Sequence, residues 1–573
     1  MVSKILLKNV LGFIISKVYP IITGICHRYW SPRNGNYLGM LEVIAQYDDF
    51  LSNHLQEHAN RGRGHINYLS HHVMEEIIQI MGDTILKEMI TRLKQSKYYS
   101  VSVDSTPDAA HVDQLTLVLR YMEGKDPVER FFAFMDNPGH CAKDMFIAMT
   151  DFLRSNNIEI ADCRGQSYDN ASAMSGQYNG LQTLIKEENE LAEWVPCSAH
   201  SLNLVLKDSA DSCHAAVDFF YFVEKLFVFF SASTKRTELL NNSEAKLSLK
   251  RISTTRWSCR ADATKALIKD YKPLQIALEK LSTDTQEKGE TRAEAMGLLR
   301  RMNTLEIGIY ACFWNNILQR ANATSKKLQT VKLDLNSAVA SLHSLREYIK
   351  DKRGEFQVFE REGEELTGAT YQVERQSRRK DDISSPSKKF EVQSFLPVID
   401  VFLSSLEKRT KAYEGIAQKF GFFRNITKMN KKDLKAAAQR LVAAYPSDLD
   451  HSFDSEIIQF SAFVQYYINE EPKKVSFEQF CYNLLHDKEV KESFPNVEVA
   501  LRMYLSLMIS NCSGERSFSK LKLIQNRLRT SMGQGRLVHL VMMSLEWDIL
   551  RELDFKDVIH FFATAKSRKV SCF

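Results

Sequence analysis

The sequence is poor in the residues that interrupt or cross-link a chain. Among its 573 residues are only 23 glycines and 12 prolines, which excludes collagen-like and linker-type chains and favours long helices. Its ten cysteines are scattered and include no C-x-x-C pair. This pattern excludes a small disulfide scaffold and a thiolate zinc finger, and it suits a reducing intracellular compartment. The formal net charge is only +5, so nucleic-acid binding has to rest on local basic patches.

Long apolar segments are lacking as well. The run Val10–Ser16 is interrupted by Lys17, so it predicts a buried helix rather than a signal peptide or a membrane span, and we expect no membrane partner. Hydrophobic residues make up 44% and charged residues 26% of the chain, as in a packed globular protein. A chain of this length exceeds one ordinary core and predicts two to four domains.

The hydrophobic pattern predicts a mixed α/β sheet in the first part of the chain and helices nearly everywhere else. Residues 1 to about 95 and the chain after His200 have helical spacing, with polar interruptions at Ser282–Thr291 and Glu362–Lys389. Between them, alternation and turn residues predict strands and two helices. The strands are expected at Ser100–Asp104, Gln114–Met122, Glu129–Met135, Arg164–Tyr168 and Val195–Ser198, and the helices at Lys143–Asn156 and Leu181–Glu190.

Two aspartates are expected at strand ends. Asp104 ends the first predicted strand and Asp169 the fourth. Central strands that finish side by side would hold both carboxylates at one edge of the sheet, where open α/β sheets bind ligands. Two carboxylates there can share Mg²⁺ or Mn²⁺, and two such ions about 4 Å apart can activate a water in phosphodiester chemistry. The alternative for each aspartate is a turn-forming role.

A third acid lies far downstream. Glu515 opens a predicted helix in the segment Asn511–Ser519. A glutamate in the first turn suits the helix dipole, and Asn511 or Ser513 can cap the helix. Judged from this segment alone, stabilising the helix start is the role that fits Glu515, and metal binding is the alternative.

Six short motifs occur along the chain in a fixed order. They are Ser102-Val-Asp-Ser-Thr, Gln114-Leu-Thr-Leu-Val-Leu-Arg-Tyr, Arg164-Gly-Gln-Ser-Tyr-Asp-Asn-Ala-Ser-Ala-Met-Ser-Gly, Cys197-Ser-Ala-His-Ser-Leu-Asn-Leu-Val, Ser253-Thr-Thr-Arg-Trp and Ser513-Gly-Glu-Arg-Ser-Phe-Ser. From about residue 35 to 550, the chain resembles the hAT-superfamily transposases of the subgroup related to zinc-finger MYM-type proteins. The resemblance implies an RNase H-like mixed sheet core interrupted by a large all-α insertion. The implied domains are 1–95, a helical N-terminal region; 96–250, the first part of the core; 251–490, the insertion; and 491–573, the last core helix with the hAT C-terminal dimerisation region.

The resemblance also implies roles for single residues. It maps an acidic triad that holds two Mg²⁺ or Mn²⁺ ions onto Asp104, Asp169 and Glu515. Cys197 and His200 match a C-x-x-H motif beside the active site. Because two ligands cannot close a tetrahedral zinc site, we expect these two residues to support the catalytic geometry or to contact DNA ends.

Further residues are expected to contact DNA. Arg256-Trp257 matches the Arg-Trp motif of the family, whose indole can stack on a base extruded from a duplex; the alternative is a core tryptophan beside a solvated arginine. Basic residues around the last helix can hold phosphates or form an ordinary solvated face. They are Lys520, Lys522, Arg527, Arg529 and Arg536.

An apolar stripe near the C-terminus suggests an oligomer. Leu537, Leu540, Val541, Ser544, Leu545 and Asp548 follow the 3/4 spacing of an amphipathic helix. In the family this region dimerises, so a homo-oligomer is implied; core packing within the chain is the other interpretation, and both can be true.

The resemblance implies a nuclear cut-and-paste transposase that cleaves DNA through a flanking hairpin and joins the freed end to target DNA. Family members usually carry an N-terminal zinc-binding DNA module, and this sequence has no Cys/His set for one. The second hypothesis is a domesticated, catalytically silent nuclear protein that binds DNA or partner proteins. A metal nuclease unrelated to transposition is a third, but it leaves the insertion and the Arg-Trp motif unexplained.

Overall fold

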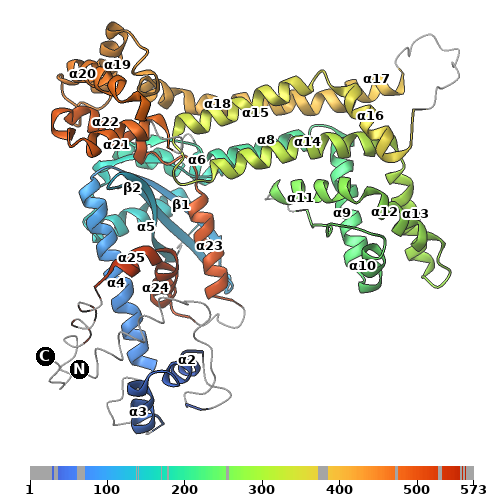
Figure 1. Cartoon of the computed structure of the whole chain (residues 1–573), viewed down its shortest axis with the longest axis horizontal. Helices are drawn as coiled ribbons and strands as arrows, with labels where there is room; N and C mark the ends of the chain where they lie inside the picture. Colours follow the sequence, from blue (N-terminus) through green and yellow to red (C-terminus); the bar gives the residue numbers. More distant parts are fainter. Residues whose placement is uncertain are drawn as a thin grey trace. The chain divides into compact units, whose positions relative to one another are not determined.

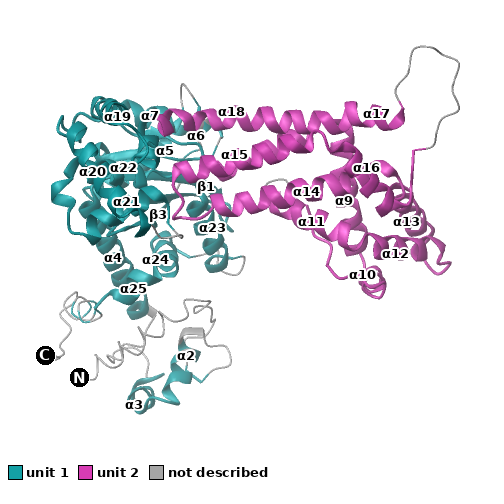
Figure 2. Cartoon of the chain, turned by 45° about the horizontal axis from the view of Figure 1, so that its top comes forward, with its two compact units in different colours: residues 1–197, 419–573 teal, residues 198–418 magenta. Residues whose placement is uncertain are grey.

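The chain divides into two compact units. Unit 1 takes residues 1–197 and 419–573, and unit 2 takes residues 198–418 (Figure 2). The computed structural model describes residues 29–30, 36–60, 71–136, 139, 141–169, 171–176, 180–252, 257–371, 385–470, 475–526, 532–554, 556, 558, 560 and 562. The run Val10–Ser16, predicted as a buried helix, lies outside these residues.

Unit 1 is built on a mixed sheet, of which Figure 1 labels β1 and β2. The sheet has five strands in the order β3-β2-β1-β4-β5. The first three strands form an antiparallel meander, and β4 and β5 are added in parallel beside β1. The strands are β1 (Tyr99–Pro107), β2 (Asp113–Glu123), β3 (Asp126–Asp136), β4 (Cys163–Gln166) and β5 (Glu193–Trp194). The predicted mixed α/β sheet is therefore confirmed, and β1 and β4 are neighbours at its centre.

The position of the fifth strand was predicted wrongly. We expected it at Val195–Ser198, whereas β5 ends at Trp194. Two backbone hydrogen bonds continue beyond it, from Val195 N to the Gln166 oxygen and from Cys197 N to the Tyr168 oxygen. Pro196 between them has no N–H to donate, so the regular ladder stops.

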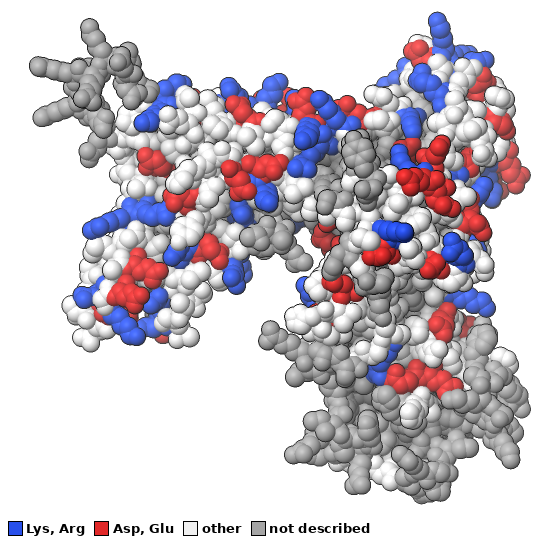
Figure 3. All heavy atoms as spheres, turned by 180° about the vertical axis from the view of Figure 1, so that it is seen from behind, with Lys and Arg blue, Asp and Glu red and all other residues white. Residues whose placement is uncertain are grey.

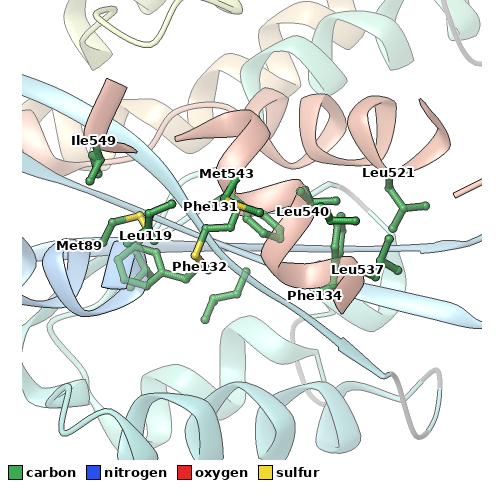
Figure 4. Packing of buried hydrophobic residues seen from close by; sticks show 14 of the residues in the cluster. Met89, Leu119, Phe131, Phe132, Phe134, Leu521, Leu537, Leu540, Met543 and Ile549 are labelled. Carbon is green, nitrogen blue, oxygen red and sulfur yellow. The ribbon is translucent and has the colours of Figure 1, made fainter. Parts of the chain in front are cut away.

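One face of the β1–β2 pair is apolar and forms the centre of the core. Its side chains belong to the main hydrophobic cluster together with residues of α4, α5 and α24, among them Met89, Met149 and Met543 (Figure 4). The strand members are Tyr99, Val101 and Val103 of β1 and Leu115, Leu117, Leu119 and Tyr121 of β2. A fully buried side chain of this kind stabilises the fold by about 1.5–3 kcal/mol.

The opposite face of the same pair is polar, yet it is also covered. Thr116 and Arg120 lie on this face of β2, because side chains alternate along a strand. Thr116 Oγ1 is 3.0 Å from Ser517 Oγ of α23, and Arg120 Nε donates to the Leu505 oxygen of α22 at 3.1 Å. Burial on both faces explains why β2 reads as an almost continuous buried strand.

Helices from the N-terminal and the C-terminal parts of unit 1 pack around this sheet. The predicted helices at Lys143–Asn156 and Leu181–Glu190 are confirmed as α5 and α7. The helices are α2 (Asn36–Ala45), α3 (Asp49–His58), α4 (His71–Ser96), α5 (Ala142–Ser155), α6 (Ser172–Ser175), α7 (Leu181–Glu188), α19 (Lys431–Ala444), α20 (Phe453–Tyr466), α21 (Phe477–Asp487), α22 (Pro495–Ser506), α23 (Cys512–Ile524), α24 (Gln534–Leu545) and α25 (Trp547–Glu552).

Unit 2 is helical throughout the part that is described, as predicted for the chain after His200. Its centre is aromatic: Trp314 packs edge-on against Phe220 and Phe313, with ring centroids 4.9 and 5.6 Å apart. Its helices are α8 (Ser198–Ala210), α9 (His214–Ser231), α10 (Thr234–Asn241), α11 (Trp257–Lys269), α12 (Tyr271–Thr283), α13 (Gly289–Met302), α14 (Leu305–Leu328), α15 (Leu335–Lys352), α16 (Phe356–Thr367), α17 (Pro386–Phe390) and α18 (Leu396–Phe420), the last of which ends in unit 1.

One of the two predicted polar interruptions of the helices is confirmed, and the other begins later than predicted. Ser282–Thr291 spans the break between α12 and α13, as predicted. The interruption expected from Glu362 begins later, because α16 continues to Thr367 and ends at the left-handed Gly368; residues 372–384 lie outside the described chain. The predicted domain boundaries at residues 95, 250 and 490 stay predictions. The division into two compact units at residues 198 and 418 follows contacts in space and does not test boundaries that came from a family resemblance.

A membrane span was not expected. Of the helices described here, none combines the length and the apolar character that crossing a bilayer requires.

The close approach of β1 and β4 can be tested at Gly165. A Cβ atom there would lie 2.2 Å from Ser100 Oγ and 3.0 Å from Leu507 Cδ2. We expect Gly165→Ala to lower the free energy of unfolding by about 1–3 kcal/mol through overpacking, measured by urea denaturation. Gly421→Ala is the matched control, because no heavy atom lies within 4 Å of its added Cβ. Equal stabilities of the two variants would contradict the packing described.

Candidate active site

Asp104 and Asp169 lie at the same edge of the sheet, on neighbouring strands. Asp104 was predicted to end its strand, but β1 continues to Pro107, so Asp104 lies within β1 opposite Thr116. Asp169 follows β4, which ends at Gln166 and runs parallel to β1. The two neighbouring strands therefore bring these carboxylates near one another, while their role as metal ligands stays a prediction.

The turn after β4 is held by local hydrogen bonds. Ser167 N donates to the Val101 oxygen at 3.0 Å, which continues the alignment with β1. The Asp169 carboxylate accepts from Ala171 N at 3.0 Å, and this is the turn-forming role that aspartate plays locally. Asp169 thus stabilises the turn and still presents a carboxylate near Asp104.

Glu515 enters from the first turn of α23. Asn511 occupies the N-cap position of this helix, but neither it nor Ser513 makes the side-chain cap that the sequence suggested. Asn511 Oδ1 instead lies 2.6 Å from the Ser102 hydroxyl of β1, and Ser513 Oγ donates to the Glu129 carboxylate of β3. Both side chains tie the helix start to the sheet, which leaves Glu515, an exposed residue, on the same side as Asp104.

The three carboxylates are close enough to influence one another. Burial, followed by the negative charges of Asp169 and Glu515, raises the pKa of Asp104 to about 7. The Ser105 backbone N–H and the Asn511 side-chain amide donate to Asp104 and oppose this rise. A shared electrostatic field among acids 65 and 346 residues apart means that the fold gathers them at one place.

The chemistry of this site fits a hard divalent cation. Its donors are carboxylate oxygens, the ligands that Mg²⁺ and Mn²⁺ prefer, and a cation would relieve the repulsion that raises the pKa of Asp104. Among the described residues, however, no three His, Cys, Asp or Glu side chains are already placed to hold one ion together. A ligand set therefore requires movement of side chains; Glu515, in the first turn of α23, is an exposed residue.

Cys197 lies beneath this site rather than at its surface. The side chain is buried, and its sulfur accepts a hydrogen bond from Asn511 N at 3.2 Å. A hydrogen bond with Cys197 and burial also raise the pKa of the neighbouring Cys512 thiol. Cys197 thus supports the loop that leads into α23. His200, the second residue of the motif, lies in the first turn of α8 in unit 2.

Trp257 is an interior residue of unit 2. Its side chain is 4% exposed, and its ring packs edge-on against Phe220 at 5.8 Å. The Arg260 guanidinium lies over the indole, 4.0 Å from its centre. This is the environment of a core tryptophan, the alternative considered above, and base stacking stays a prediction that requires this packing to open. Arg256 lies outside the described residues.

The basic residues near α23 contribute unequally. Lys520 and Lys522 lie on α23, and Lys522 is exposed. Arg536 on α24 is ion-paired with Glu75 and largely buried, so it is not available to phosphates. Arg527 and Arg529 lie outside the described residues. On the face drawn in Figure 3, the described basic and acidic side chains are interspersed rather than gathered by sign.

The apolar stripe of α24 is used inside the chain. Leu537, Val541 and Met543 are at most 1% exposed and belong to the core cluster with β3 and α4. Figure 4 shows Leu537, Leu540 and Met543 facing the strands. The buried members of the stripe are therefore used within the chain, and an interface between copies has to use exposed or partly exposed residues of this region.

Sequence reasoning missed the tertiary role of Asn511. Its position before a helix suggested a cap, whereas its side-chain oxygen lies 2.6 Å from the Ser102 hydroxyl of β1. Nothing in the local sequence separates these roles, because the partners are about 400 residues away.

Two segments of unit 1, one before and one after unit 2 in the sequence, match known protein families. Residues 9–180 match the family described as ZMYM1/FAM200, RNase-like domain, and residues 470–549 match the hAT family C-terminal dimerisation region. The first match contains Asp104 and Asp169, and the second contains Glu515.

Curated relatives extend the similarity to most of the chain. The human protein named "52 kDa repressor of the inhibitor of the protein kinase" is 21% identical over 517 residues, which are 84% of this chain and 65% of that protein. The mouse protein of the same name is also 21% identical, over 83% of this chain and 66% of its own length. The chain thus spans slightly less than two thirds of the length of these relatives. With an RNase-like domain of the ZMYM1/FAM200 type and a hAT dimerisation region on one compact unit, the chain is a transposase-derived protein of the hAT family.

Proposed function

We propose that this chain cleaves and joins DNA strands at the site formed by Asp104, Asp169 and Glu515, with Mg²⁺ or Mn²⁺ as cofactor. The observation that carries the proposal is that the fold gathers Asp169 and Glu515 around the half-buried Asp104 from distant parts of the chain: the pKa of Asp104 is raised first by burial and then by the charges of these two carboxylates. When bound, two such ions activate a water and stabilise the leaving oxygen of a phosphodiester. Membership of the hAT family supports DNA as the substrate.

The residues of the chain have separate tasks in this reaction. Asp104 and Asp169 present carboxylates from the sheet edge, and Glu515 approaches them from α23. Lys520 and Lys522 lie further along the same helix, where they can bind the phosphates of the DNA backbone. A water cleaves one strand, and the freed 3′-hydroxyl attacks the opposite strand to leave a hairpin on the flanking DNA. A later 3′-hydroxyl joins the target. The proposed place of action is the nucleus, where the DNA is.

A second candidate function is a domesticated protein that acts by binding and not by cleavage. It is favoured by the absence, among the described residues, of any three acids, histidines or cysteines already placed to hold an ion. It also agrees with the name of the relatives, which describes a repressor. Terminal inverted repeats flanking the reading frame would favour the transposase, whereas a single-copy gene with introns and no such repeats would favour the domesticated protein.

Nuclease activity provides the direct test. We expect purified protein with Mn²⁺ to nick a duplex that carries the genomic sequences flanking the reading frame, and to yield hairpins on denaturing gels. Asp104→Asn should reduce nicking at least 100-fold, because the carboxylate is lost while its shape is kept. Asp151→Asn is the matched control, since Asp151 is an exposed residue of α5 in the same unit. Undiminished nicking by Asp104→Asn would remove Asp104 from the mechanism.

The crowding of acids also predicts a pH-dependent stability. The pKa of Asp104 is about 7 in the folded protein, and its ordinary value, which applies to the unfolded chain, is 3.8. Between these two pH values the folded state therefore binds one proton more than the unfolded state. The contribution of Asp104 to the free energy of unfolding therefore falls as the pH rises from about 4 to 7. Without divalent metal, we expect Asp104→Asn to be more stable than wild type at pH 8, by at most about 4 kcal/mol.

The measurement is urea unfolding with a chelator at pH 5 and pH 8. The advantage of Asp104→Asn should shrink at pH 5, and Asp151→Asn should show no such dependence. An advantage of Asp104→Asn that is equal at both pH values would contradict the described environment of Asp104.

The proposed homo-oligomer depends on a surface other than the α24 stripe. In the described part of the dimerisation region, Leu523 and Trp547 are large hydrophobic residues that are about half exposed, and Arg551 stacks on Trp547 at 4.4 Å. Tryptophan and arginine are typical of interface centres. We expect Trp547→Ala to shift the protein toward monomer in sedimentation experiments without loss of folding. Leu540→Ala should instead lower the unfolding free energy by about 2–5 kcal/mol. An unchanged oligomer in Trp547→Ala would rule out this surface.

A further inference from the structure

Arg260 is a charged residue in the interior of unit 2. It lies in the first turn of α11, and the central carbon of its guanidinium is 4.0 Å from the centre of the Trp257 ring and 4.4 Å from that of Phe220. Its Nε atom is buried. Among the described residues, none forms a hydrogen bond with this Nε, and none forms an ion pair or a hydrogen bond with the two terminal nitrogens. The guanidinium therefore has aromatic neighbours but no acceptor for its N–H groups.

Another arginine of unit 2 shows what this arrangement lacks. Arg236 also stacks on an aromatic ring, that of Phe229, at 4.5 Å. Its guanidinium in addition donates to the Phe229 oxygen at 3.1 Å and to the Thr291 hydroxyl at 3.0 Å. Arginines that leave water normally find such acceptors, because an unpaired charge is costly to bury. Arg260 is an exception to this rule.

Arg260 keeps its charge in spite of its surroundings. Burial lowers the pKa of Arg260 to about 10, and the negative charge of Asp211 acts in the opposite direction. A side chain with this pKa is still protonated at neutral pH. The protein thus holds a partly desolvated cation whose donors are open to an external acceptor.

The donors of Arg260 face a cavity. Arg260 lines a space of about 580 Å³ in unit 2, together with the apolar side chains of Val217, Phe220 and Ile252 and the ring of Tyr221. Sites for small molecules have volumes of this order and are mainly apolar, with a few polar groups that orient the ligand. A cavity with one unfilled cation on an apolar wall has this composition.

The other charged groups of the cavity favour a ligand with a single anionic group. Glu224 accepts from Ile252 N at 2.9 Å and pairs with Arg251 at 3.4 Å, so its charge is used within the chain. Asp211, an exposed residue, also lines the cavity. A polyanion such as a nucleic-acid strand would bring further phosphates toward these two carboxylates. One oxyanion can instead pair with the planar guanidinium through two parallel hydrogen bonds.

We propose that this cavity binds a small organic anion, whose carboxylate or phosphate group pairs with Arg260 and whose apolar body lies against Val217, Phe220 and Ile252. The ligand supplies the acceptor that the chain does not provide. Because the apolar walls keep water away from the pair, the attraction between the charges is stronger than at an open surface. The inference is independent of the proposed DNA cleavage, since it uses no residue of the acid site.

The test is titration calorimetry of the full chain at constant ionic strength, with benzoate and phenyl phosphate as probes and the neutral benzamide as their control. We expect at least one of the two anions to bind at one site per chain with a Kd of about 1 mM or lower, and benzamide to bind about tenfold more weakly or not at all. Arg260→Met keeps the length of the side chain without its charge. It should weaken binding of the anion about 10- to 100-fold, the loss expected for hydrogen bonds to a charged group.

Arg236→Met is the matched control. It removes an arginine of unit 2 that also stacks on a ring but donates within the chain and does not line the cavity. The affinity for the anion should therefore stay unchanged. Circular dichroism identifies folded variants. Where Arg260→Met does not fold, Arg260→Lys replaces it: the charge stays, the planar pair of donors is lost, and binding should weaken in the same direction, but less.

Several results would overturn the inference. They are a failure of both anions to bind, equal binding of benzamide, wild-type affinity in the folded Arg260 variant, and an equal loss in Arg236→Met, which would indicate a general effect of charge. If a single-stranded oligonucleotide bound in an Arg260-dependent manner while neither small anion did, the ligand would be a nucleic acid and the small-molecule assignment would be wrong.

Discussion

Hydrogen bonds between the start of α23 and the polar face of β1 and β2 hold the two halves of the candidate site together. Ser102 meets Asn511, and Thr116 meets Ser517, across 409 and 401 residues of sequence. Together with the bond from Ser513 to Glu129 and the core packing of α23, these contacts fix the position of Glu515 relative to the two aspartates. The bonds are buried, so breaking one leaves polar groups without water and costs more than the bond itself contributes. The acid site is therefore a property of this helix–sheet contact and not of any single segment.

The long separation of these segments is less costly than it looks. The entropic cost of closing a loop grows only with the logarithm of its length. The connection of 409 residues from Ser102 to Asn511 therefore costs only about 1.6 kcal/mol more than the connection of 65 residues from Ser102 to Ser167. An apolar face buried against α4 and α24 stabilises unit 1 by far more than this. Residues 198–418 can thus form a compact unit of their own between two parts of one core.

The sequence was most informative where a pattern is local. Alternation in Ser100–Asp104 predicted β1, and its apolar members do enter the core. Alternation alone suggests water on the polar face, but α22 and α23 cover that face, and their identity depends on residues about 400 positions away. The same limit applies to Asn511, whose local signal is that of a cap, and to Trp257, whose burial is decided by Phe220 and Arg260. For the fifth strand, by contrast, the local sequence did contain a signal. Pro196 has no backbone N–H to donate, so the strand should have been predicted to end before residue 196.

The electrostatics of Asp104 place stability and function in opposition. Burial and two neighbouring carboxylates disfavour its charged form, while the Ser105 N–H and the Asn511 amide favour it. Above pH 7, a protein that used this region only as a scaffold would be more stable with an uncharged residue at 104, since burial and the two neighbouring carboxylates disfavour the charge more than the two donors favour it. A divalent cation reverses the balance, because it turns the same repulsion into binding energy. The two donors offset only part of the cost of this charge, and a divalent cation is the group that would offset the rest, which is the physical argument for the proposed metal-dependent activity.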